Sequence, residues 1–78
     1  MAKTATAADL RPAALRYVAD QAVRYLLQVG EPAKTGQITG FIGEEQPVSA
    51  KVVRDVLTLD PRVLIRERRW DLAVRNID

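Results

Sequence analysis

The chain has 78 residues, of which 47% are hydrophobic and 28% charged, with a formal net charge of +2 and neither cysteine nor histidine. This length supports one domain with a modest apolar core, and the missing residue types exclude disulfides, thiolate metal sites and imidazole catalysis, so we expect no enzyme activity, metal or cofactor. Its apolar runs are far shorter than the ~20 residues of a membrane span and its start lacks a signal-peptide apolar region, so we expect an intracellular, cytoplasmic protein without a membrane partner.

The first predicted element is a long helix. Residues 1–8 contain no anchoring apolar side chain, so we expect a flexible lead-in followed by one domain over residues 9–78. Asp9 is a suitable N-cap, and apolar residues then recur at helical spacing. Gly30 accepts a positive φ and Pro32 blocks continuation, which predicts that the helix ends at Gly30.

A short second helix is predicted over residues 35–42, with Thr35 as its cap. Its apolar face carries Ile38, Phe41 and Ile42. Gly36 and Gly40 weaken an isolated helix by about 1 kcal/mol each relative to alanine, and we interpret them as allowing a close approach to the first helix. The glycine spacing resembles a phosphate loop only superficially, because no Lys-Ser/Thr follows and no strand precedes it, so no small-molecule ligand is expected.

A third helix is predicted over residues 50–59, with Ser49 as its N-cap. Its buried face is expected to hold Val52 or Val53, together with Val56 and Leu57. The opposite face carries Lys51, Arg54, Asp55 and Thr58, where Arg54 can be neutralised by the adjacent Asp55.

The C-terminal third predicts a β-hairpin with an excess of positive charge. Asp60-Pro61 ends the third helix, and residues 63–65 and 70–73 alternate as half-buried strands do, with Trp70 in the core. The four residues between these strands lack Gly and Asn, so we expect a longer and more mobile loop than a two-residue turn. Residues 49–75 carry seven basic against four acidic side chains, whereas residues 1–48 carry five of each.

This order of elements resembles the winged helix-turn-helix superfamily. Residues 47–73, PVSAKVVRDVLTLDPRVLIRERRWDLA, are most similar to the HARE-type winged helix found at the N-terminus of the RNA polymerase delta subunit and in some chromatin-associated proteins. In that family an Asp-Pro-Arg closes the third helix and a basic turn leads to Trp-x-Leu, as in Asp60-Pro61-Arg62 and Trp70-Asp71-Leu72 here. The family usually has an aromatic residue at Val63 and glycine at Glu67 and Arg68. The resemblance implies a mainly α, α+β winged helix-turn-helix fold of three helices followed by a two-stranded β-hairpin wing.

The basic residues predict a site for DNA. A helix in the major groove presents its solvent face to base edges, while arginines of a wing suit phosphate oxygens or a narrow minor groove. The N-terminus of the third helix offers a further phosphate contact. The predicted DNA-binding residues are Ser49, Lys51, Arg54, Thr58, Arg66, Arg68 and Arg69. The competing interpretations are that the exposed cations serve solubility or protect an edge strand from aggregation.

We therefore expect a duplex-DNA-binding module in transcription regulation or another nucleoprotein process. The alternative is a protein-interaction winged helix that docks onto polymerase, replication or other nucleoprotein machinery through the first helix or the sheet. The modest net charge, the phosphate-repelling Glu44-Glu45 pair and two tyrosines on the first helix, Tyr17 and Tyr25, favour this alternative. Because the chain ends soon after the hairpin, the function can also belong to a longer protein that carries this domain.

Overall fold

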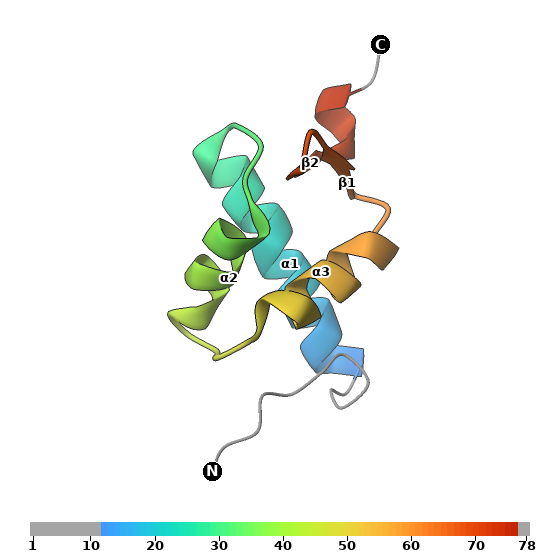
Figure 1. The fold of residues 1–78 in the computed structure, drawn as a ribbon. Coiled ribbons are helices and arrows are strands. Elements are labelled where there is room, and N and C mark those ends of the chain that lie inside the picture. Colours follow the sequence, from blue (N-terminus) through green and yellow to red (C-terminus); the bar gives the residue numbers. More distant parts are fainter. Residues whose placement is uncertain (1–11, 77–78) are drawn as a thin grey trace.

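The computed structural model describes residues 12–76. Three helices precede a hairpin and a short 3-10 helix (Figure 1), namely α1 (Pro12–Val29), α2 (Thr35–Gly43), α3 (Ala50–Leu59), β1 (Val63–Arg66), β2 (Arg69–Leu72) and η2 (Ala73–Asn76). This confirms the predicted mainly helical α+β fold with a winged-helix-like topology. The expected lead-in and the Asp9 cap lie outside the described residues.

The core lies where the three helices meet, with α1 passing behind α2 and α3 in the view of Figure 1. The largest fully buried side chains are Leu26, Ile38, Ile42, Leu57, Val52 and Val53. Burial of each such side chain contributes about 1.5–3 kcal/mol to folding, so packing holds even the short, glycine-containing α2 in place. None of the helices within residues 12–76 combines the length and apolarity needed to cross a bilayer.

The hairpin closes the core through one of its two faces. β1 and β2 pair antiparallel, and the register places Val63 opposite Leu72 and Ile65 opposite Trp70. Val63, Leu72 and Trp70 are buried in the same cluster as the helices. Because successive residues alternate between the faces of a strand, the neighbouring pairs Leu64–Asp71 and Arg66–Arg69 occupy the outer face.

The linker between α1 and α2 is joined to this two-stranded sheet by an isolated β-bridge. Ala33 pairs antiparallel with Trp70, and the two residues exchange N–H···O bonds of 2.9 and 2.8 Å. The Trp70 indole Nε1 also donates to Thr35 Oγ1 at 2.9 Å. The start of β2, next to the hairpin turn, is therefore tied to the start of α2 by both backbone and side chain.

The predicted start of α3 and end of α1 are confirmed. Ser49 Oγ accepts a 3.2 Å hydrogen bond from the N–H of Val52, which satisfies one of the free donors at the start of α3. Gly30 follows α1 with a φ of +72°. Only glycine adopts this conformation without steric cost.

The predicted cap of α2 is wrong by one residue. Lys34 is the N-cap, and its backbone N–H donates to Gln37 Oε1 at 2.8 Å. Thr35 is the first helical residue, and its hydroxyl accepts from Trp70. The hydroxyl that the sequence suggested for capping is therefore used to anchor the hairpin.

The interpretation of Gly36 and Gly40 is also wrong. Both glycines are exposed, and a Cβ atom placed on either one meets nothing within 4 Å. The side of α2 that faces the core carries Ile38 and Ile42 instead, with Phe41 partly buried beside them. The two glycines therefore permit no close helix contact.

Candidate nucleic-acid interface

The solvent face of α3 carries the cations predicted for it. Lys51, Arg54 and Thr58 are all exposed, opposite the buried Val52, Val53 and Leu57. Asp55 lies 3.6 Å from Lys51 Nζ, one turn away, rather than neutralising the adjacent Arg54. Arg54 makes no ion pair within residues 12–76, so it is the freest cation of this face.

The hairpin turns in two residues, so the expected longer loop is wrong. β1 continues to Arg66 and β2 starts at Arg69, which leaves Glu67 and Arg68 as the turn. Their φ values of 53° and 67° are those of a type I′ turn, whose twist matches that of antiparallel strands. Asn and Gly are the residues that normally adopt it, and their absence from the turn concealed it in the sequence.

The two arginines that flank the turn face each other. Arg66 and Arg69 form the last cross-strand pair of the hairpin, and both side chains are exposed. Like charges directly opposite on a sheet destabilise it. Arg68 and Arg69 make no hydrogen bond or ion pair with another side chain of the described segment. The hairpin tip therefore combines a cross-strand repulsion with two residues in left-handed conformations.

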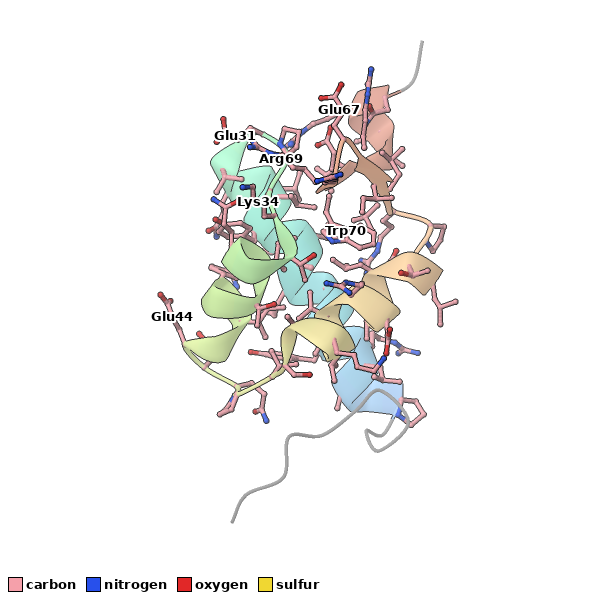
Figure 2. The ribbon with its side chains drawn as sticks, in the orientation of Figure 1. Glu31, Lys34, Glu44, Glu67, Arg69 and Trp70 are labelled. Carbon is pink, nitrogen blue, oxygen red and sulfur yellow. The ribbon has the colours of Figure 1, made fainter. Side chains whose placement is uncertain are left out.

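The outer face of the hairpin borders an open, polar hollow of about 470 Å³. It is lined by Pro32, Arg66, Glu67, Arg69 and Asp71. In Figure 2, Arg69 lies on the side of the hairpin toward the α1–α2 linker, where Glu31 and Lys34 are. Two guanidinium groups beside an open hollow suit an oxyanion such as phosphate, although the carboxylate of Glu67 opposes part of their field.

A polar network that the sequence analysis missed joins the hairpin to η2 and α1. Asp71, which is 7% exposed, accepts hydrogen bonds from Leu72 N at 2.9 Å, Arg75 Nη1 at 3.1 Å and Asn76 Nδ2 at 3.1 Å. Arg75 Nη2 also donates to the Leu26 carbonyl near the end of α1. Burial opposes ionisation of Asp71, but the hydrogen bonds from Asn76, Leu72 and Arg75 outweigh it and hold the pKa of the carboxyl below its ordinary value.

A second ion-pair cluster fixes the connection between α3 and β1. Arg62 lies 2.8 Å from Asp60 Oδ2 and 2.9 Å from Asp20 Oδ1 on α1. The hydrogen bond from Arg62 lowers the pKa of Asp60, and the hydrogen bonds to Asp60 and Asp20 raise the pKa of Arg62. Arg62, the arginine of the Asp-Pro-Arg motif, therefore fixes the turn between α3 and β1. Its positive charge is neutralised by the carboxylates of Asp60 and Asp20.

The two tyrosines of α1 contact α2 and the loop that follows it. Tyr17 donates its hydroxyl to Glu45 Oε2 at 3.0 Å, and this bond raises the pKa of Tyr17. The ring of Tyr25 packs on Phe41 with centroids 5.0 Å apart. Figure 2 shows Glu44 at the far end of α2 from Arg69, so this acidic end of α2 does not screen the hairpin tip.

Comparisons of the chain with protein-family models, curated proteins and solved structures find no match. The winged-helix-like topology therefore rests on the order of the three helices and the hairpin. Within residues 12–76, no three His, Cys, Asp or Glu residues cluster as metal ligands would.

Proposed function

We propose that this domain binds duplex DNA, with α3 in the major groove and the hairpin, its wing, on the adjacent phosphate backbone. Transcription regulation or another nucleoprotein process is the setting that such a module suits. The observation that carries the proposal is the wing tip, where Arg66, Arg68 and Arg69 are all exposed within four residues.

The tip is built at the expense of stability, and this supports a functional role. A type I′ turn of Glu67 and Arg68 places two L-residues at positive φ, and the adjacent Arg66–Arg69 pair sets two like charges opposite each other. Conformational strain and unfavourable charge placement concentrate at functional sites. Charged side chains also protect an edge strand from aggregation, but binding a polyanion in addition turns the repulsion between the arginines into attraction for phosphate.

The residues of α3 would contribute unequally to binding. Arg54 and Lys51 are candidates for base or phosphate contacts, although Lys51 must first leave Asp55. Thr58 donates its hydroxyl to the Arg54 carbonyl at 2.7 Å, so it can only accept from DNA. Ser49 Oγ is used as the helix cap, so its contribution would come through the N-terminal amides of α3.

A salt titration with a matched control tests the proposal. With four or five phosphate contacts, log K for random duplex DNA should fall against log salt with a slope of about −3.6 to −4.5. Arg68→Glu/Arg69→Glu should abolish most binding and reduce the slope by about 2. Arg16→Glu/Arg24→Glu, on exposed positions of α1, makes the same change in net charge and should retain the slope. Equal losses in both double variants, or no binding at 50 mM salt, would contradict the proposal.

Membership of the HARE-type subfamily is a finer proposal. Asp60 and Arg62 clamp the end of α3 to Asp20, and Trp70 and Leu72 are buried in the core. Both motifs that carry the resemblance therefore have structural roles that support the winged architecture.

Docking of a protein is the second candidate function, favoured by an apolar groove between α1 and α3. The groove has a volume of about 450 Å³, and its apolar lining includes Leu15, Ala19, Val56 and Leu59. Leu59 is 85% exposed, which is unusual for a large apolar side chain at the end of a helix. A pull-down that retains one protein partner after nuclease treatment, and loses it with Leu59→Lys, would favour docking over DNA binding.

A further inference from the structure

One wing arginine differs from the others because the C-terminal turn holds it. Arg66 Nη1 donates a 2.7 Å hydrogen bond to Asn76 Oδ1 in η2. The other wing arginines, Arg68 and Arg69, have no such partner in the segment 12–76. Arg66 is therefore the wing cation whose guanidinium has a defined position before any ligand arrives.

The Asn76 amide can be oriented in only one way. Its Nδ2 donates to Asp71 Oδ2 at 3.1 Å and to the Leu72 carbonyl at 3.0 Å. A flipped amide would direct its oxygen at these two acceptors and its NH₂ group at the guanidinium of Arg66, losing all three bonds. The oxygen of Asn76 is thus left facing Arg66.

Hydrogen bonds to the core of the domain hold the Asn76 amide in this orientation. Asp71 is nearly buried, and Arg75 connects its carboxylate to the Leu26 carbonyl of α1. A chain of hydrogen bonds therefore runs from α1 through Arg75, Asp71 and Asn76 to Arg66. Because α1 packs against α3 in the core, these bonds fix the position of the Arg66 guanidinium relative to α3.

We propose that Asn76 is a positioning residue for the wing, which holds the Arg66 guanidinium ready to bind a phosphodiester of the DNA backbone; this inference rests on the proposed function. Arg66 has five N–H donors and Asn76 engages one, so four remain for phosphate oxygens. Holding an arginine side chain in place before binding removes an ordering cost that corresponds to about a two- to twelvefold change in affinity.

A double-mutant cycle on duplex DNA tests whether Asn76 acts through Arg66. Asn76→Ala should weaken binding by about two- to twelvefold in the unaltered background and have no further effect in Arg66→Ala. Its salt slope should match that of the unaltered protein, because no charge is removed, whereas Arg66→Ala should reduce the slope by about 1. Val74→Ala, at a 68% exposed position of the same turn, should leave binding unchanged.

The outcomes separate this inference from the function on which it rests. Thermal unfolding by circular dichroism fixes a temperature at which every variant is folded, and binding is measured there. An equal loss from Asn76→Ala in both backgrounds, or no loss in either, overturns the positioning role while duplex binding stands. Failure of the unaltered protein to bind duplex DNA overturns the proposed function and the positioning role together.

Discussion

The two-residue turn of the hairpin has a conformation that its residues do not favour, so we predict that substitutions there can stabilise the domain. The same turn lies in the region that we propose to bind DNA. Glu67 and Arg68 have φ values of 53° and 67°, in a turn type for which Asn-Gly is the preferred pair. We expect Glu67→Asn/Arg68→Gly to raise the free energy of unfolding. The double variant also removes the Glu67 carboxylate, which opposes phosphate, so weaker binding to duplex DNA is expected of the single variant Arg68→Gly, which removes only a wing arginine.

The size of the effect follows from two opposing contributions. The left-handed conformation costs an ordinary L-residue roughly 1–2 kcal/mol, a cost that glycine avoids and asparagine reduces. The greater conformational freedom of glycine in the unfolded chain offsets roughly 0.5–1 kcal/mol of that stabilisation. The net stabilisation should be about 1 kcal/mol, which corresponds to a rise of about 4–8 °C in the melting temperature of a domain this small.

Thermal unfolding followed by circular dichroism measures this change, and the single variant Arg68→Ala is the matched control for the single variant Arg68→Gly. Alanine removes the charge as glycine does but keeps the cost of a positive φ, so Arg68→Ala should bind DNA as weakly as Arg68→Gly without gaining its stability. If the two variants melt at the same temperature, relief of charge repulsion explains any gain and the argument from turn conformation is wrong. An unchanged or lower melting temperature for Glu67→Asn/Arg68→Gly would refute it as well.

Further predictions concern the helices and the carboxylates of Asp60 and Asp71. Gly30→Ala should lower the free energy of unfolding by about 1–2 kcal/mol because Gly30 has a positive φ. Gly36→Ala should raise it by up to about 1 kcal/mol, because this helical position is exposed and has room for a Cβ atom. Urea unfolding of both variants tests these opposite signs. Ser49→Ala removes the acceptor for the Val52 N–H and should cost about 1 kcal/mol in the same assay. The pKa values of Asp60 and Asp71 are lowered in the folded state, so their contribution to stability should be complete above the unfolded carboxyl pKa of about 4 and be lost as the pH falls below it. Urea midpoints measured from pH 7 to pH 2 test this, and a flat profile would contradict it.

The elements that the sequence predicts well are those fixed by neighbouring residues. Ser49 caps α3 through a bond to a residue three positions away, and the backbone of Gly30 ends α1 by its own conformation. The burial of Trp70 follows from its alternation with Leu72 on one strand face. In each case the signal and the structure lie within a few residues of one another.

The errors arise where a distant partner decides the outcome. The hydroxyl of Thr35 binds the indole of Trp70, 35 residues away, so its role as an N-cap passes to Lys34. Strand pairing and packing of the hairpin impose positive φ on Glu67 and Arg68 against their own preference, and a pattern based on propensity cannot anticipate this.

For the candidate site, the sequence predicts which cations are exposed but not how each is held. Lys51 pairs with Asp55, and Arg66 is bound by Asn76, a residue that carries no charge and matches no motif. The network around Asp71 forms because η2 folds back onto the hairpin and brings Arg75 and Asn76 to this carboxylate. No residue pattern in the sequence predicts that fold-back. Exposure can be inferred from periodicity, whereas side-chain partners require the tertiary fold.

The only tryptophan of the chain lies where three segments meet, and this gives the domain a built-in optical reporter. Trp70 pairs with Ala33 through the backbone, donates its indole N–H to Thr35 and is only 3% exposed. Undocking of the hairpin would bring water to the indole, and its fluorescence would shift to longer wavelength. Emission from a single position can thus follow the hairpin separately from helix content, without any label.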